Sequence, residues 1–168
     1  MQINITKRFV ITGVLTVLTF FATYLLIRPT AESVMREFYE GERYEGWIAA
    51  PLKNHTSLVK WRVIEDIADK NMRYRAYAMG FLGECNVTEA LPALLAILDD
   101  QTEKAVFRAD ALEAIFLLDP TRAMALADRY AEREDRLGYI AKHVKSGKLP
   151  WTDFEDTDND DVGAVCSQ

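Results

Sequence analysis

After residue 56, apolar residues recur every three or four positions, with short polar segments between the runs. This is the spacing of amphipathic α-helices, whose apolar side faces a core. The pattern also repeats, because a shift of 33 residues places Arg75 on Arg108 and Ala78 on Ala111. A fixed period of about 20–50 residues indicates stacked units that bury their apolar faces against their neighbours. The sequence therefore predicts an all-α fold containing a short α-solenoid of helical hairpins.

Short polar segments mark the turns between the predicted helices. Pro120 cannot continue the helix before it, and Thr88 and Thr121 stand where the second helix of each pair is expected to begin. A threonine hydroxyl at such a position accepts a hydrogen bond from a free backbone N–H, so we expect both threonines to be N-caps. Before the repeats, a short helix from Thr30 to Tyr39 is expected to end at Gly41.

An uncharged apolar run occupies residues 9–27, with Lys7 and Arg8 before it and Arg28 and Pro29 after it. At about 1.5 Å per residue, a helix of this length just spans the hydrocarbon core of a bilayer, which is roughly 30 Å thick. A cleaved signal peptide and a buried core helix are the alternatives, but the apolar run is longer than a signal peptide needs. The sequence therefore predicts a single N-terminal transmembrane helix that anchors the chain in the lipid bilayer.

The orientation of this predicted anchor is not decided by the count of basic residues. Lys7 and Arg8 lie on one side, and Arg28, Arg36 and Arg43 lie on the other. A short basic N-terminus directly before an apolar run usually stays in the cytoplasm. We therefore expect a single-pass membrane protein with its soluble domain on the non-cytoplasmic side, periplasmic or extracellular, and the opposite orientation stays open.

Aromatic side chains gather at the end of the expected short helix and directly after it, at Phe38, Tyr39, Tyr44 and Trp47. These rings have two interpretations. They cap the open end of the helical stack or lie at the level of the lipid headgroups, or they form a docking surface for a membrane partner, since aromatic residues are enriched at protein interfaces. The second interpretation makes the four residues candidates for partner binding.

Charge divides the chain unevenly. Residues 151–168 hold six of the 26 acidic residues and no Lys or Arg, so the preceding residues carry 20 charges of each sign. A neutral body lacks the clustered basic face that nucleic acids select, so no nucleic-acid partner is expected. With the patterns above, the chain divides into four segments: a membrane anchor helix at 1–28, a juxtamembrane helix and aromatic linker at 29–56, helical repeats at 57–147, and an irregular acidic C-terminal tail at 148–168.

The repeated segment resembles HEAT repeats, especially the short HEAT-like type of bilin-lyase subunits, over about residues 57–131. The family pattern has an Arg and small residues on the first helix, a Pro opening the second helix, and an Asp before the next Arg. Arg75 and Arg108 match the Arg, Pro92 matches the Pro, and Asp66 and Asp99 match the Asp. The resemblance implies a structural ladder of Asp–Arg pairs between neighbouring repeats. The third unit departs from the pattern and is expected to be a terminal cap.

A charge-lined active site is the alternative role for these four ladder residues, but equal spacing favours a structural role because a catalytic site is asymmetric. Elsewhere, His55 and His143 lack acidic or cysteine neighbours at metal-ligand spacing. Cys85 and Cys166 belong to no CxxC pair, so they fit a structural zinc site or a disulfide-dense fold poorly. The sequence therefore predicts no catalytic residues and no resident cofactor.

Alternate aspartates in the tail, Asp156, Asp158 and Asp160, supply oxygen ligands at the spacing that a calcium loop uses. Residues 156–166 resemble one thrombospondin type 3 calcium repeat, whose pattern also ends in a Cys, here Cys166. The resemblance implies a possible metal site for calcium at the three aspartates. A solvated acidic terminus is the other interpretation.

Two functions are compatible with these patterns. The first is a non-enzymatic membrane-anchored helical-repeat scaffold, an accessory subunit or assembly factor of a membrane protein complex. Such a scaffold would bind an integral-membrane or membrane-associated partner through the solenoid surface and the anchor. The second, implied by the resemblance alone, is a HEAT-like subunit of a bilin-lyase-type enzyme, for which the sequence offers no acid–base or nucleophile constellation.

Overall fold

The computed structural model describes residues 19, 28–41, 47–150 and 166–167. The chain divides into two units, residues 1–30 and residues 31–168. In the first unit, Thr19 is helical, and the rest of the predicted anchor at 9–27 lies outside the described residues. In the part of the chain that is described, no helix combines the length and the apolar character needed to cross a bilayer.

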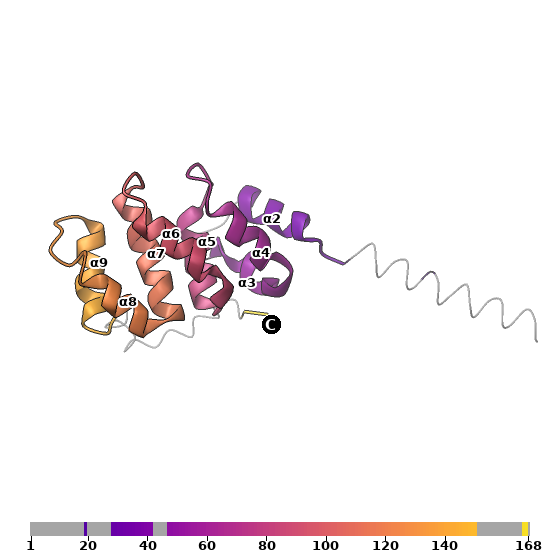
Figure 1. The fold of residues 1–168 in the computed structure, drawn as a ribbon. Helices are drawn as coiled ribbons and strands as arrows, with labels where there is room; N and C mark the ends of the chain where they lie inside the picture. The colour runs from indigo at the N-terminus through magenta and orange to yellow at the C-terminus, as the bar shows by residue number, and fades with distance from the viewer. Residues whose placement is uncertain (1–18, 20–27, 42–46, 151–165, 168) are drawn as a thin grey trace, which may run out of the picture. The chain divides into compact units, whose positions relative to one another are not determined.

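The second unit confirms the all-α prediction for the residues that the structure describes, which form eight α-helices, one 3₁₀ helix and no strand. The helices form a row from α2 to α9 (Figure 1). Their bounds are α2 Ala31–Glu40, α3 Ala50–Asn54, α4 Thr56–Asp66, α5 Arg75–Glu84, η2 Thr88–Ala90, α6 Leu91–Asp99, α7 Ala105–Leu118, α8 Pro120–Ala127 and α9 Arg136–Lys145.

Helices α2, α3 and α4 form one end of this row. The α2 helix packs against α3 and α4 and buries Val34, Met35 and Phe38. It lies one residue further along the chain than the sequence predicts, and the Gly41 N–H donates to the Glu37 carbonyl at 3.0 Å where the helix ends. Pro51 stands in the first turn of α3, where its missing N–H costs no hydrogen bond.

The α7 helix is the central element of the unit. It contacts α5, α6, α8 and α9, so it is enclosed on several sides. This position explains why its sequence is apolar nearly all round rather than along one stripe. Gly83 allows α5 to approach α7 closely, because a Cβ atom added there would lie 3.0 Å from the Cα of Ala114.

The predicted N-caps at Thr88 and Thr121 are wrong. The Asp119 side chain accepts the Arg122 N–H at 3.0 Å, and Pro120 is the first residue of α8, so Thr121 lies inside the first turn. Thr88 opens the 3₁₀ helix, which has no side-chain cap. Aspartate directly before a proline takes the capping role because the proline fixes the first helical position.

The C-terminal residues return to the first helices of the unit. Cys166 forms a disulfide with Cys85 at the end of α5, and their Cα atoms are 5.5 Å apart. Ser167 donates its N–H to the Lys53 carbonyl at 2.9 Å, and its Oγ accepts the Thr56 N–H at 3.2 Å. Because α4 has no side-chain cap of its own at His55, Ser167 satisfies its first backbone N–H. The sequence pattern alone predicts no pairing of the two cysteines.

We expect joint replacement of the cysteines, Cys85→Ser with Cys166→Ser, to lower the free energy of unfolding by about 4 kcal/mol. The reason is that the disulfide removes loop-closure entropy from the unfolded chain over a separation of 81 residues. Urea denaturation of the full chain in detergent measures the loss. A reductant should weaken the wild-type chain to the same extent and leave the double variant unchanged; equal stability of all three samples would contradict the expectation.

Candidate functional site

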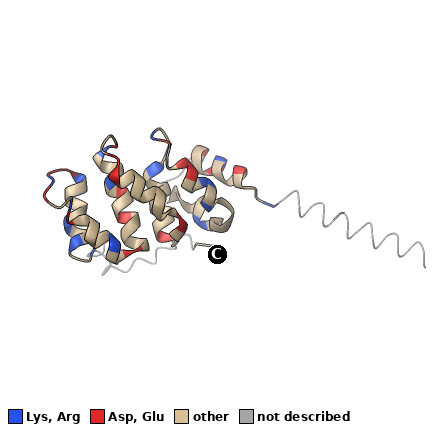
Figure 2. Ribbon diagram, viewed as in Figure 1, with Lys and Arg blue, Asp and Glu red and all other residues tan. Residues whose placement is uncertain are grey.

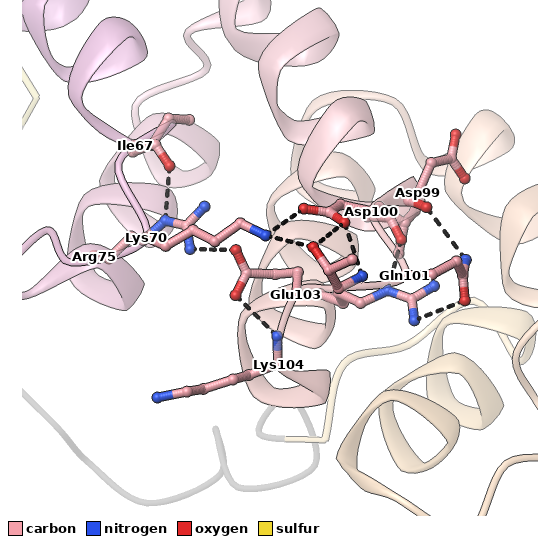
Figure 3. A network of polar contacts seen from close by, with 11 residues as sticks. Ile67, Lys70, Arg75, Asp99, Asp100, Gln101, Glu103 and Lys104 are labelled. Atoms are coloured by element: carbon pink, nitrogen blue, oxygen red, sulfur yellow. Dashed lines mark hydrogen bonds and ion pairs between the residues drawn. The ribbon is translucent and has the colours of Figure 1, made fainter.

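The four residues of the predicted ladder lie at the α4–α5 turn and the α6–α7 turn, but they do not pair as expected. Arg75 donates from Nε to the Ile67 carbonyl at 2.7 Å and from Nη1 to Glu103 Oε2 at 2.6 Å (Figure 3). The Arg75 and Glu103 side chains are 2% and 3% exposed, so this is a buried ion pair. The guanidinium also lies over the Phe107 ring, 5.1 Å from its centroid. Arg75 therefore joins the end of α4 to the start of α7.

Arg108 occupies the equivalent place one unit later. Its Nε donates to the Leu98 carbonyl at 2.8 Å, and its guanidinium lies 5.3 Å from the centroid of the Tyr130 ring. Its acidic partner is absent, because Nη1 reaches only the amide oxygen of Gln101 at 3.5 Å. The Nη2 atom is buried without a hydrogen-bond partner. Arg108 thus has the same kind of backbone contact and aromatic contact as Arg75, but it has no ion pair.

The two predicted ladder acids have other partners. Asp66 accepts the Tyr39 hydroxyl at 3.1 Å and Arg62 Nε at 3.0 Å. Asp99 accepts the Tyr130 hydroxyl at 3.1 Å and Arg129 Nη2 at 2.9 Å. The Asp–Arg pairing is therefore wrong, because each arginine instead satisfies a backbone carbonyl at the end of a helix, where carbonyls lack partners within the helix.

Burial and these polar contacts together shift the pKa values of neighbouring groups. Burial opposes ionisation of Glu103, but hydrogen bonds from Arg75 and from the Lys104 N–H outweigh it and lower the pKa of the Glu103 carboxyl. Burial, followed by the Asp66 charge, raises the pKa of the Tyr39 hydroxyl to about 12. Beside the buried pair, Lys70 Nζ donates to Asp100 Oδ2 at 2.6 Å (Figure 3). Two ion pairs thus link the turn after α4 to the turn after α6.

The aromatic residues proposed for partner binding separate into different environments. Phe38 is 1% exposed and packs against the rings of Tyr39 and Tyr74, so it is a core residue and cannot contact a partner. Tyr39 is partly buried by its contact with Asp66. Trp47 is 50% exposed, and Tyr44 lies outside the described residues. Trp47 alone of the described three keeps the exposure that a docking role needs.

The predicted calcium ligands Asp156, Asp158 and Asp160 lie outside the described residues. Within the described residues, no group of three or more His, Cys, Asp or Glu side chains is placed to hold a metal ion. Charges of both signs are interspersed over the drawn helices and turns (Figure 2). The calcium hypothesis therefore stays a prediction.

A pocket of about 340 Å³ lies between α3, α5 and α7. Its walls are mainly apolar, and its acidic groups are Glu84, Asp110 and Glu113. At the rim, Lys53 Nζ lies 2.6 Å from Glu84 Oε2. The lining residues are Ala49, Lys53, Ala76, Tyr77, Gly80, Phe81, Glu84, Asp110, Glu113, Ala114 and Leu117.

Asp110 and Glu113 are the chemically distinctive residues of this pocket. They lie one turn apart on α7, and their side chains are only 11% and 13% exposed. The cation facing both is Arg136 of α9, whose Nη2 lies 3.5 Å from Asp110 Oδ1 and 3.7 Å from Glu113 Oε1. Asp110 Oδ2 and Glu113 Oε1 are buried and accept no hydrogen bond. When both groups are ionised, one arginine therefore faces two carboxylates.

The pKa values of the Asp110 and Glu113 carboxyl groups are both raised. Burial raises the pKa of Glu113 to about 7, the Asp110 charge adds to the rise, and Arg136 opposes it. Burial also raises the pKa of Asp110, again against the effect of Arg136. A raised carboxyl pKa in a pocket is typical of functional sites.

Sequence reasoning missed this acidic pair. The signal was present, because Asp110 and Glu113 lie three residues apart within an otherwise apolar helix, and acids there are expected only on a solvated face. Recognising them required knowing that α7 is enclosed by its neighbours, which the 33-residue period alone does not reveal.

We expect Glu103→Ala to lower the free energy of unfolding by about 3–5 kcal/mol, because removal of one partner leaves Arg75 charged and buried without an acid. Thermal or urea denaturation measures this loss. The matched control is Asp128→Ala, which breaks an exposed pair with Lys145 and should cost less than about 1 kcal/mol. Similar losses in the two variants would refute a special role for the buried pair.

We expect Glu113→Gln to remove part of the pH dependence of stability. Because the folded-state pKa is raised from 4.5 to about 7, Glu113 binds its proton more tightly in the folded chain. That contribution is fully present below pH 4.5 and is lost as the pH rises through about 7. At pH 8 the variant should therefore be more stable than the wild-type chain by roughly 3 kcal/mol, with little difference at pH 4. Denaturation at both pH values tests this, and an equal difference at the two would contradict it.

Comparison with known proteins assigns no family. No protein-family model, no curated protein and no solved structure matches the chain. The resemblance to HEAT-like repeats stays a prediction, and the function is inferred from the chain's own residues.

Proposed function

We propose that this chain is a non-enzymatic, membrane-anchored helical-repeat scaffold that serves as an accessory subunit or assembly factor of a membrane protein complex. The observation that carries this proposal is the pocket between α3, α5 and α7. It combines mainly apolar walls with two largely buried carboxylates, which one arginine faces at 3.5 Å and 3.7 Å. Such a concave apolar site with a few polar groups is the usual form of a recognition site.

The equivalence of Arg75 and Arg108 supports the helical-repeat part of the proposal. These residues are 33 positions apart, and each donates from Nε to a carbonyl near the end of the preceding α-helix. Each guanidinium also lies over an aromatic ring of a later helix or turn. Repetition of the same contacts at the same period is expected of a HEAT-like α-solenoid, in which each unit is fixed by its neighbour.

The disulfide supports the non-cytoplasmic location of the second unit. Disulfides persist in oxidising compartments such as the periplasm or the extracellular space and are rare in the cytosol. The Cys85–Cys166 bond ties the C-terminal residues to the end of α5, and the Ser167 N–H donates to the Lys53 carbonyl beside it. With the apolar run at 9–27 as an anchor, the helices would stand outside the cytoplasm and meet partners confined to the same membrane.

A second candidate, a HEAT-like subunit of a bilin-lyase-type enzyme, is favoured by one observation. Glu113 has a raised pKa beside Asp110, and such a pair can act as general acid and base. The scaffold is preferred because the described lining of the pocket contains no Ser, Thr, Cys or His that would act as a nucleophile or a shuttle.

Isolation of the tagged full-length chain from its own membranes in mild detergent tests the proposal. We expect a stoichiometric integral-membrane partner, identified by mass, and loss of most of that partner in Gly80→Trp. This substitution fills the pocket without disturbing the backbone, because a Cβ atom at Gly80 meets only Glu84 Oε1, at 3.8 Å.

The matched control is Lys142→Trp, which adds the same ring on the exposed side of α9 and should retain the partner. A chain that is recovered alone and covalently modifies a chromophore or a peptide would overturn the scaffold in favour of the enzyme.

A further inference from the structure

When both of its groups are ionised, the acidic pair on α7 has one more charge than Arg136 balances. Arg136 lies 3.5 Å and 3.7 Å from the nearest oxygens of Asp110 and Glu113, which is too far for a strong hydrogen bond. Asp110 Oδ2 and Glu113 Oε1 are buried and accept no hydrogen bond. Buried polar atoms are nearly always hydrogen-bonded, so two such oxygens beside one pocket indicate that a donor from outside the described chain completes the site.

The shape of the pocket restricts the donor. At about 340 Å³ it is near the lower limit of pockets that take small ligands, roughly 300–1,000 Å³, so it has room for one side chain rather than a peptide segment. Ala76, Gly80 and Ala114 line the approach with small apolar surfaces. A long side chain with an alkyl stem and a cationic end matches this combination, because its stem packs on apolar surface while its head carries the charge.

A divalent metal ion matches the site less well. The pocket places two carboxylates on α7 with Arg136 close to both, and the described residues hold no group of three metal-ligating side chains. Calcium and magnesium bind six or more oxygen ligands, which is more than these two carboxylates supply. A monovalent organic cation needs only the two carboxylate groups of Asp110 and Glu113 as acceptors.

We propose that this pocket receives one arginine or lysine side chain of the partner protein, with the cationic head bound by Asp110 and Glu113 and the alkyl stem along Gly80 and Ala76. The proposal rests on the scaffold function above and names the chemistry by which the partner is recognised. A planar guanidinium donates to both carboxylates at once, so arginine suits the pair better than lysine.

The test uses n-butylguanidinium, a free analogue of the arginine side chain, added to the isotope-labelled full-length chain in detergent micelles. NMR should show saturable shifts of the Ala76, Gly80 and Ala114 amides. The neutral analogue n-butylurea should leave these amides unshifted, because it has the same stem without the charge. Joint replacement Asp110→Asn with Glu113→Gln should weaken the affinity roughly tenfold or more, which is the loss expected for a charged hydrogen-bonded pair.

Two controls keep the result decisive. Asp128→Asn makes the same chemical change at an exposed site and should bind as the wild-type chain does. The double variant removes buried charge while keeping side-chain shape, so it should fold, and its melting curve confirms this. Equal shifts with n-butylurea, or no shift at the three amides with n-butylguanidinium, would overturn the proposal.

The two proposals fail in different ways. If the chain co-purifies with a stoichiometric partner but n-butylguanidinium does not shift the pocket amides, the cationic side chain is wrong and the scaffold stands. If the pocket binds n-butylguanidinium but the chain has no protein partner in its membranes, the side chain of a partner is excluded as the ligand, and the scaffold is overturned as well.

Discussion

The buried pair between Arg75 and Glu103 is the interaction on which the arrangement of the second unit depends. Burying two charges is costly unless each is paired and hydrogen-bonded, and here the arginine has both a carboxylate and a helix-end carbonyl as acceptors. The pair connects the start of α5, which follows the turn after α4, with the turn after α6. It therefore joins the first residue of α5 to the segment directly before α7, and these two helices supply most of the pocket lining.

The arginine that corresponds to Arg75 at the α6–α7 turn, Arg108, has different polar neighbours. Arg108 keeps the backbone acceptor and the aromatic contact but meets an amide, Gln101, instead of an acid. An arginine without an acid in a buried place is less well compensated, so the second junction is held more by packing than by charge.

Sequence patterns predict helix bounds, which depend on local periodicity. They do not predict side-chain partners that come from distant parts of the chain. The bounds of α2 were predicted within one residue, because apolar spacing and a stopping glycine are local signals. The partners of Arg75 were not, because the spacing to Asp66 identifies a nearby acid but not which acceptor the guanidinium reaches. The N-cap of α8 shows the same limit within a single turn. Asp119 and Thr121 are both residue types that cap helices, and Asp119 has the role because Pro120 is the first residue of the helix. The pocket acids and the disulfide were inaccessible for the same reason, being defined by contacts between distant parts of the chain.

The disulfide has a topological consequence. Because Cys85 and Cys166 are covalently joined, the backbone from α6 to the C-terminal residues forms a closed ring, attached to the rest of the chain at the end of α5. A protease that cuts once inside this ring produces no separate fragment, since both new ends remain attached through the sulfur atoms. Shedding a piece from this part of the molecule requires a second cut or a reducing agent. After a single cut, α6 to α9 therefore stay covalently attached to α5 through the Cys85–Cys166 bond.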